Sequence, residues 1–278
     1  MAVGTDLASS AKLPPVAGQA VYLGRIDYGV AWKLQQLVVE QRQLGQLSDT
    51  LLLCEHGDVI TVGRRQTGLS NVLERRFPVF EIERGGDVTY HGPGQLVGYP
   101  IVALRPSEDP AQPFGEQDLH AFLRALEDGL MELCRGCGIV CDRKPRYTGV
   151  WTADLRFKLA SLGVAVRRWV TSHGFALNVT TDLTRFFAIN PCGMQAEVMS
   201  SLAQLGGQRD GQPVSLQGLL GPCAQAIGDA LGRSFPLRSV ADSGLAPLLQ
   251  EATLRPELPR PALDREGREG QEGLDRLT

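Results

Sequence analysis

The chain has 278 residues, of which 43% are hydrophobic and 21% are charged, and its formal net charge is −3. This composition is typical of a soluble globular protein with one large domain or two small ones. It excludes the basic excess of a nucleic-acid-binding surface, and no apolar run approaches the roughly 18 residues that a membrane span needs. The N-terminal residues lack the continuous apolar segment of a secretory signal, so we expect a cytoplasmic protein with mostly reduced cysteines.

Composition divides the chain into three segments. Residues 1–19 are rich in Ala, Ser, Pro and Gly, which predicts a flexible N-terminal arm. Residues 20–238 carry the regular apolar patterns of one folded domain. Residues 239–278 are dominated by Pro, Gly and alternating charges, which predicts a disordered or draped C-terminal tail.

Within the domain, short apolar runs typical of strands alternate with segments whose apolar residues recur at helical spacing. We expect strands at 21–23, 51–55, 59–62, 79–82, 96–104, 150–152, 158–166 and 175–179, and helices at 28–44, 116–134 and 215–231. A parallel crossover needs roughly a dozen residues or more, so short connections predict antiparallel pairing of 51–55 with 59–62 and of 158–166 with 175–179. The fold class is therefore α+β, with a mostly antiparallel or mixed sheet and flanking helices.

A glycine-rich segment runs from Arg84 to Gln95 and reads RGGDVTYHGPGQ. Its glycines permit positive φ angles and a close approach of the backbone to a ligand. The spacing of Gly92, Gly94 and Gly98 is one residue too long for a dinucleotide-binding loop, and a strand follows instead of a helix. Two interpretations stay open, a pair of tight turns at strand ends or a binding loop, and the polar residues Asp87, Tyr90 and His91 favour the second.

Lys158 is one of only four lysines, the others being Lys12, Lys33 and Lys144. Unlike arginine, lysine can lose its proton when its surroundings favour the neutral form. Strand alternation places Lys158 on one face with Ala160 and Leu162, where it would be partly desolvated. The alternative is an edge-strand lysine that discourages aggregation.

Cys192 lies between Pro191 and Gly193, in a constrained turn whose backbone N–H groups could stabilise a thiolate or an oxyanion. The alternative is an inert core cysteine. A second turn, Ser172-His173-Gly174, is expected at a strand start, where a lone histidine is more often structural than catalytic.

Cys134, Cys137 and Cys141 form a C-x-x-C-x-x-x-C pattern that suggests a metal site or a redox pair. No second pair of ligands lies nearby in the sequence. The chain also lacks a P-loop and an H-E-x-x-H motif. We therefore expect no metal and no cofactor.

Five motifs in order, RGGDVTYHGPGQLVGYP, YTGVW, KLASLGV, SHGFALNV and INPCG, resemble those of the lipoyl(octanoyl) transferases over about residues 21–236. These enzymes are octanoyl-[acyl-carrier-protein]:protein N-octanoyltransferases. The resemblance implies a fold like the catalytic domains of biotin and lipoate protein ligases, and it makes 20–238 a catalytic domain. It implies transfer of an octanoyl group to a lysine of lipoyl domains, the first step of endogenous protein lipoylation.

The resemblance also implies the partners and the site. Acyl carrier protein would deliver the octanoyl group on its phosphopantetheine arm, and the acceptors would be the lipoyl domains of 2-oxoacid dehydrogenases and the glycine cleavage H protein. Cys192 would hold the acyl group as a thioester, and Lys158 would tune it. The implied substrate contacts are Arg84, Gly85, Gly86, Asp87, Val88, Thr89, Tyr90, His91, Ser161, Leu162, Gly163, Gly174, Phe175 and Ala176.

This chemistry is plausible without a cofactor. A free thiol has a pKa of about 8.5, so a nearby ammonium would raise its thiolate fraction at neutral pH. After acylation, neutral Lys158 could act as base for the acceptor lysine, which predicts ping-pong kinetics. The alternatives are an ATP-dependent lipoate–protein ligase, an amidotransferase between lipoyl domains, a cysteine hydrolase with His173 or His91 as base, and a non-catalytic lipoyl-domain binder.

Overall fold

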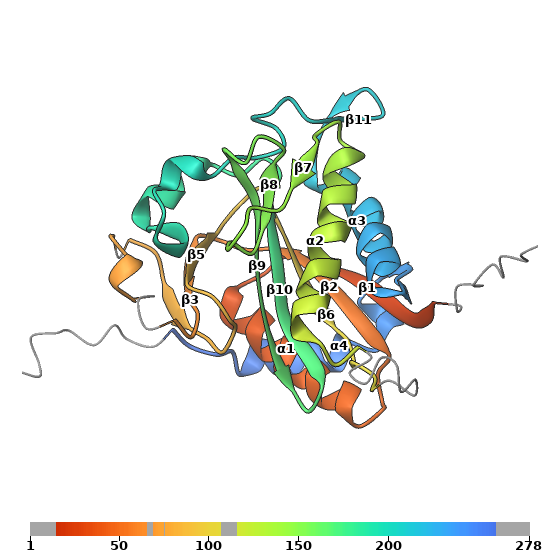
Figure 1. The fold of residues 1–278 in the computed structure, drawn as a ribbon. Helices are drawn as coiled ribbons and strands as arrows, with labels where there is room; N and C mark the ends of the chain where they lie inside the picture. Colours follow the sequence, from red (N-terminus) through yellow and green to blue (C-terminus); the bar gives the residue numbers. More distant parts are fainter. Residues whose placement is uncertain (1–14, 66–68, 75, 107–115, 260–278) are drawn as a thin grey trace, which may run out of the picture.

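The computed structural model describes residues 15–65, 69–74, 76–106 and 116–259, and for Cys192 it describes the backbone (Figure 1). Residues 1–14 of the expected arm and 260–278 of the expected tail lie outside the described residues. The described part forms a large mixed sheet with helices on both faces and a smaller sheet beside it.

The main sheet has nine described strands in the order β13-β1-β2-β6-β10-β9-β8-β7, with β14 also paired to β1. The strands are β1 (Val16–Arg25), β2 (Asp49–Glu55), β6 (Gln95–Ile101), β7 (Cys141–Asp142), β8 (Val150–Thr152), β9 (Lys158–Arg167), β10 (Val170–Asn178), β13 (Arg233–Ser234) and β14 (Leu237–Arg238). β1 runs parallel to its neighbours, whereas the pairings from β2 to β7 are antiparallel. The predicted hairpin of 158–166 with 175–179 is confirmed as β9 and β10.

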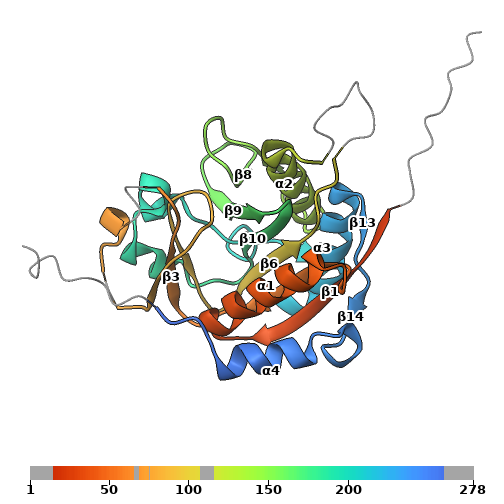
Figure 2. The same cartoon turned by 90° about the horizontal axis from the view of Figure 1, so that it is seen from below.

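Alternate residues of β2 face two different hydrophobic cores, so both faces of the sheet are buried. Leu51 and Leu53 pack on the side of α2 and α3, and Leu52 and Cys54 pack on the side of α1 and α4 (Figure 2). These helices are α1 (Tyr28–Gln43), α2 (Leu119–Arg135), α3 (Leu216–Leu231) and α4 (Ala246–Leu254).

The helices begin and end at residues suited to those positions. The Asp27 carboxylate accepts a hydrogen bond from the N–H of Val30 at the start of α1. Asp118 and Ser215 cap α2 and α3 in the same way, and such caps satisfy backbone donors that have no partner within the helix. Gly232 ends α3 with a φ of 64°, a conformation that glycine adopts without strain.

The smaller sheet consists of β4 (Val79–Glu81), β3 (Val59–Val62) and β5 (Val88–His91), with β3 in the centre. The predicted antiparallel pairing of 51–55 with 59–62 is therefore wrong. Both edges of β2 are already paired, to β1 and β6. Between β2 and β3, the buried ring of His56 hydrogen-bonds the Ile26 carbonyl at 2.9 Å, and the chain leaves the main sheet there.

Short elements connect these parts. They are the 3₁₀ helices η1 (Leu69–Asn71), η2 (Leu183–Ala188), η3 (Pro191–Gly193), η4 (Ala196–Val198) and η5 (Ala241–Ser243), and a small hairpin of β11 (Gln208–Arg209) and β12 (Gln212–Pro213). η2 and η4 pack on the outer face of the smaller sheet and form a separate hydrophobic core with it.

The folded body extends beyond both boundaries expected from composition. β1 begins at Val16 and not near residue 20. After residue 238 the chain continues into α4, which packs on α1. Leu245 and Ala252 are fully buried there, so the described part of the expected tail is anchored by its own apolar residues.

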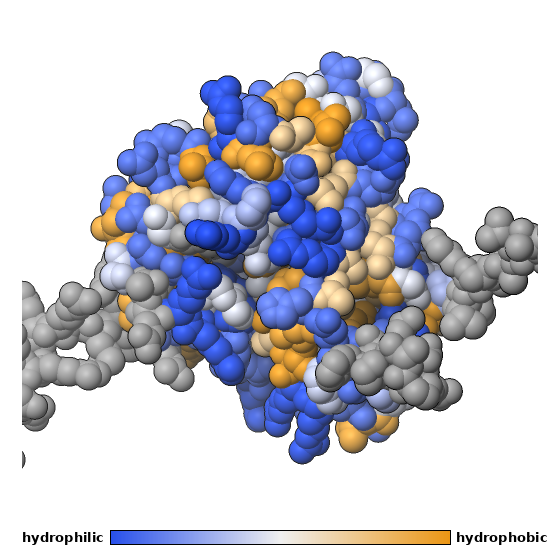
Figure 3. Space-filling model, viewed as in Figure 1, coloured by the Kyte–Doolittle hydropathy of each residue, from blue (hydrophilic) through white to orange (hydrophobic). Residues whose placement is uncertain are grey.

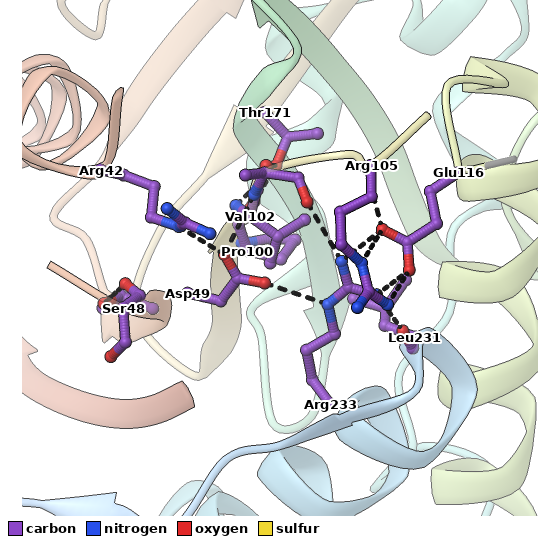
Figure 4. Close-up of polar contacts among 12 residues, drawn as sticks. Arg42, Ser48, Asp49, Pro100, Val102, Arg105, Glu116, Thr171, Leu231 and Arg233 are labelled. Carbon is purple, nitrogen blue, oxygen red and sulfur yellow. Dashed lines mark hydrogen bonds and ion pairs between the residues drawn. The ribbon is translucent and has the colours of Figure 1, made fainter. Parts of the chain in front are cut away.

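A buried ionic network joins the beginning of β2 to the end of α3 (Figure 4). Arg233 donates to Asp49 at 3.0 Å and to both carboxylate oxygens of Glu116 at 2.7 Å. Asp49 also accepts from Arg42 at 2.6 Å. The network therefore links elements that are far apart in the sequence.

The outer surface carries both hydrophilic and hydrophobic groups. On the face drawn in Figure 3, hydrophobic groups form separate patches among hydrophilic ones. Among the described helices, none has the length and apolar character that a bilayer crossing requires.

Candidate active site

A narrow pocket of about 50 Å³ lies between the smaller sheet and the β9–β10 hairpin. Its walls come from the segment that leads into β5, from β5 and β6, and from β9 and β10, with Tyr28 at the start of α1. The structure thus gathers predicted residues that are far apart in the sequence. Those that line the pocket are Lys158, Arg84, Gly86, Asp87, Val88, Thr89, His91, Ser161, Leu162, Gly163, Gly174, Phe175 and Ala176.

Lys158 is the first residue of β9 and is only 1% exposed. The desolvation that strand alternation predicts is therefore confirmed. β9 pairs with Trp151 of β8 at this position, and the Lys158 carbonyl accepts the N–H of Ser200 at 2.9 Å. The Lys158 Nζ atom lies 5.8 Å from the centre of the Trp151 ring, within the range of a cation–π contact.

The backbone of Gly149 packs directly against the Lys158 side chain. Gly149 has a φ of 146°, and a Cβ atom at this position would lie 2.5 Å from Lys158 Cε. Its N–H donates to the carboxylate of Glu127 at 2.9 Å. Glu127 is fully buried in α2 and also accepts from Arg124 and Arg143, so an ionic cluster on the helix holds the backbone of Gly149 in place.

The segment before β5 forms the opposite wall, held by hydrogen bonds of Arg84. The Arg84 guanidinium donates to the carbonyl and hydroxyl oxygens of Thr61, at 2.9 and 3.1 Å. The N–H of Gly85 donates to the Val164 carbonyl of β9 at 3.0 Å. A Cβ atom on Gly163 would lie 2.7 Å from the Gly85 carbonyl oxygen, so glycine is required for this close approach. Of the expected substrate contacts from Arg84 to His91, only those up to Asp87 lie in a loop, because β5 begins at Val88.

β10 closes the pocket with Phe175, whose ring lies over Gly98 of β6. A Cβ atom on Gly98 would be 2.1 Å from the Phe175 Cζ atom. The predicted turn at Ser172-His173-Gly174 is wrong, since these residues lie inside β10. His173 adopts a φ of 57° there, its N–H bonds Gln35, and burial lowers the pKa of its ring.

Two further histidines beside the pocket have fixed, neutral rings. His91 hydrogen-bonds the Gln95 side-chain oxygen through Nδ1 at 2.8 Å and the Thr61 hydroxyl through Nε2 at 3.3 Å. Burial lowers the pKa of His91 to about 3 and that of His56 to about 4. The His56 Nδ1 faces the Ile26 carbonyl, so its Nε2 accepts from the Tyr99 hydroxyl at 2.7 Å. With both nitrogens engaged, His91 is poorly suited to act as a general base.

Cys192 is carried by η3, which lies beside β5 and η1. The turn closes through a bond from the Gly193 N–H to the Asn190 carbonyl at 3.0 Å. Asn71 connects this turn to the pocket wall, because its carbonyl accepts from Asn190 and its amide donates to Asp87, both at 2.8 Å. The backbone of Cys192 is thereby fixed next to the wall that β5 forms.

Two predicted contact residues do not line the pocket. Gly85 turns its N–H toward β9, and Tyr90 faces the outer core, where its hydroxyl donates to Asp58 at 2.6 Å. The sequence did not predict four lining residues from other elements, Tyr28, Ile82, Val97 and Tyr99. It also did not predict that Asn71 links the Cys192 turn to Asp87. No local pattern marks the four lining residues, because only the packing of α1, of β6 and of the residue that follows β4 brings them here.

The three spaced cysteines lie at the end of α2 and in β7. Cys134 and Cys137 are buried and Cys141 is partly buried, and all three are free thiols. In the described part of the chain, no group of three or more His, Cys, Asp or Glu side chains is arranged to hold a metal ion.

Comparison with known proteins identifies the family. Residues 27–225 match the lipoyl protein ligase A/B catalytic domain. The chain belongs to this family. The match covers the strands and helices that build the pocket, including β5, β9 and η3.

Sequence relatives in the family support a transferase. An octanoyltransferase of Geotalea uraniireducens is 48% identical over 186 residues, which are 66% of this chain and 82% of the relative. One of Syntrophotalea carbinolica is 41% identical over 219 residues, which are 79% of this chain and 97% of the relative. The resemblance to this family of acyltransferases is thus confirmed.

Solved structures show the same fold. A lipoate-protein ligase A bound with ATP superposes with a TM-score of 0.66 at 15% identity, over 86% of this chain and 95% of that one. A bipartite lipoate protein ligase of Thermoplasma acidophilum gives 0.63 at 15% identity, over 86% and 93%. The predicted α+β fold of the ligase type is confirmed.

Proposed function

We propose that this acyltransferase moves an octanoyl group from acyl carrier protein to a lysine of lipoyl domains, through a thioester on Cys192. The acceptors are the lipoyl domains of 2-oxoacid dehydrogenases and the glycine cleavage H protein. The relatives named octanoyltransferases support the acyl group. One observation carries the mechanism: a lysine that is 1% exposed lines the pocket beside the segment that bears Cys192.

In the first half-reaction the Cys192 thiolate attacks the carbonyl carbon of the octanoyl thioester. The new S–C bond forms as the bond to the carrier sulfur breaks, and the leaving thiolate takes a proton from the Lys158 ammonium. A buried ammonium stabilises an adjacent thiolate more than an exposed one does, since water screens it less. The products are octanoyl-Cys192, the free carrier thiol and neutral Lys158.

In the second half-reaction neutral Lys158 removes a proton from the acceptor amine. The amine attacks the thioester carbon, an amide forms, and the Cys192 thiolate leaves. Lys158 ends the cycle protonated and Cys192 ends it as thiolate, so both return to their starting states. Conversion of a thioester to an amide is downhill, and we propose that neither a metal nor another cofactor takes part.

The pocket suits an unbranched acyl chain. Ile82, Val97, Leu162 and Phe175 give it apolar walls, and the glycines let the loop and the two strands lie close together. Burial of methylene groups against these walls would favour an extended apolar chain.

Intact-mass measurement after mixing with octanoyl carrier protein tests the proposal. The wild type should gain one octanoyl group, Cys192→Ser should form no thioester, and Lys158→Arg, which keeps the charge but cannot act as base, should slow transfer to the acceptor. Lys144→Arg is the matched control, because Lys144 contacts the same Trp151 ring at 4.4 Å but does not line the pocket. An adduct that survives Cys192→Ser would refute the covalent scheme.

The alternatives make different predictions in the same assay. An ATP-dependent ligase would use free octanoate with ATP, and an amidotransferase would use an octanoylated lipoyl domain as donor. A hydrolase would release octanoic acid and would need a histidine base, for which the neutral, fully bonded His91 offers little support. A non-catalytic binder would be insensitive to Cys192→Ala.

A further inference from the structure

Thr89 is the second residue of β5 and lines the pocket. It is 7% exposed. Val88 and Tyr90 on either side of it contribute to the outer core of the smaller sheet. Since side chains alternate along a strand, Thr89 points to the opposite face, toward the pocket.

The hydroxyl of Thr89 is buried, and in the described part of the chain it has no hydrogen-bond partner. The paired strand provides a contrast. Thr61 lies directly opposite on β3, and its hydroxyl contacts both Arg84 and His91, at 3.1 and 3.3 Å. The Thr61 hydroxyl therefore bonds to residues of the pocket wall, whereas the Thr89 hydroxyl bonds to none of the described residues.

A buried hydroxyl without a partner lowers the stability of the folded state, and valine would fill the same space without that cost. A threonine at this position is therefore expected to meet its partner in a bound molecule. The reacting thioester of a bound acyl substrate would lie close to Thr89. β5 lies beside η3, which carries Cys192, and Lys158 lines the same pocket as Thr89.

We propose that the Thr89 hydroxyl donates a hydrogen bond to the acyl oxygen of the substrate. Thr89 is then a catalytic residue of the proposed octanoyl transfer, on which this inference rests. As Cys192 attacks, the carbonyl π electrons move to that oxygen and form a tetrahedral oxyanion. Thr89 stabilises this charge without giving up its proton. When the C=O bond re-forms, the carrier thiolate leaves and is protonated by Lys158, as in the first half-reaction.

Three variants test the inference in single-turnover acylation by octanoyl carrier protein, followed by rapid quenching and intact mass. Thr89→Val removes the hydroxyl at nearly constant volume and should slow acylation of Cys192 about 100-fold, the effect typical of a lost oxyanion donor. Thr89→Ser keeps the hydroxyl and should stay within a few-fold of the wild type. Thr181→Val is the control, because Thr181 is 5% exposed, also has an unpartnered hydroxyl, and does not line this pocket.

Thermal unfolding separates catalysis from folding. Both valine variants should melt at the same temperature as the wild type or higher, and only Thr89→Val should be slow. Acylation of Thr89→Val at the wild-type rate would overturn the inference, and so would a clear drop in its melting temperature, which would mean that the hydroxyl has a stabilising partner in the protein. If the wild type itself forms no adduct on Cys192, the proposed function fails instead.

Discussion

The backbone of Gly149 packs directly against the side chain of Lys158. A Cβ atom at Gly149 would lie 2.5 Å from Lys158 Cε and 3.3 Å from Nζ. Real Cβ atoms do not approach carbon as closely as the first of these distances, so any larger residue would have to displace the lysine. Because Lys158 is buried and lines the pocket, displacing its side chain would move the amino group relative to the pocket.

Gly149→Ala should therefore slow acylation of Cys192 by at least about 10-fold. The added methyl group pushes Lys158 away, and alanine at a φ of 146° is strained, with an expected loss of roughly 1–3 kcal/mol of stability. Gly138→Ala is the control, since Gly138 also has a positive φ, 79°, but no atom within 4 Å of the added carbon. Rate measurements on folded protein should show a loss for Gly149→Ala alone. Equal rates in the two variants would contradict a positioning role.

Glu127 should help to position the backbone of Gly149, because its carboxylate accepts the Gly149 N–H at 2.9 Å. Glu127→Leu leaves that buried donor unpaired and breaks contacts to two arginines, so unfolding in urea should show a loss of roughly 1–3 kcal/mol. Glu127→Gln keeps an acceptor for Gly149 and should acylate faster than Glu127→Leu. Glu132→Leu on the same helix is the control, since Glu132 pairs with Arg135 on the exposed surface. Equal acylation rates in Glu127→Leu and Glu127→Gln would show that this hydrogen bond does not position Gly149.

Much of the fold follows from local pattern. The periodicity of apolar residues predicts α1 and α3 within about one residue at each end, and the short connection predicts the β9–β10 pairing. The burial of Lys158 follows from its apolar neighbours on the strand. Composition alone does not predict α4, because Pro, Gly and charged residues dominate residues 239–278, although Leu245, Leu248, Leu249 and Ala252 have helical spacing.

The remaining features depend on contacts between distant elements. β2 and β3 are separated by three residues, and nothing in those residues shows that β2 already has two partners and that β3 belongs to another sheet. The link from Asn71 to Asp87 and Asn190 joins η1, the segment before β5 and the turn that carries Cys192. Tyr28 reaches the pocket because α1 packs against β6 and β10. The motif resemblance could name the pocket residues, but it could not separate Tyr90, which faces the outer core, from Thr89, which faces the pocket.

Stability should fall as the pH drops below neutral, because His56 and His91 are buried as neutral rings. Their pKa values are about 4 and 3 in the folded protein, against about 6.5 when unfolded. Between pH 6.5 and 4 the unfolded chain binds both protons and the folded chain binds neither. Their contribution is thus complete above pH 6.5 and is lost as the pH falls, at roughly 1.4 kcal/mol per pH unit for each ring.

Urea unfolding at pH 7 and pH 5 measures this effect, and a loss of roughly 4 kcal/mol is expected. His56→Gln should reduce the pH dependence, because glutamine takes up no proton in this range. Its neutral amide can still donate to the Ile26 carbonyl and accept from the Tyr99 hydroxyl, so the fold should be kept. His120→Gln, at an exposed position on α2, should leave it unchanged. A stability that is the same at both pH values would mean that the two buried rings take up protons in the folded state.

Arg233 should contribute strongly to stability and little to catalysis. Its guanidinium is 4% exposed and connects Asp49, which is 1% exposed, to Glu116, whose pKa is lowered to about 2 (Figure 4). Arg233→Met removes the shared cation and leaves Asp49 with Arg42 and Glu116 with Arg105 as their remaining partners. Breaking a buried pair costs about 3–5 kcal/mol, and because each carboxylate keeps one arginine we expect a loss at the lower end of this range.

Arg135→Met is the matched surface control, because Arg135 and Glu132 are both exposed and such pairs contribute at most about 1 kcal/mol. High salt should weaken the surface pair more than the buried one, since ions screen exposed charges more effectively. The acylation rate per folded molecule should match the wild type in both variants, because neither arginine lines the pocket. A slow acylation rate in Arg233→Met with normal stability would contradict a structural role for Arg233. It would mean that this network acts on the active site and does not hold β2, α2 and α3 together.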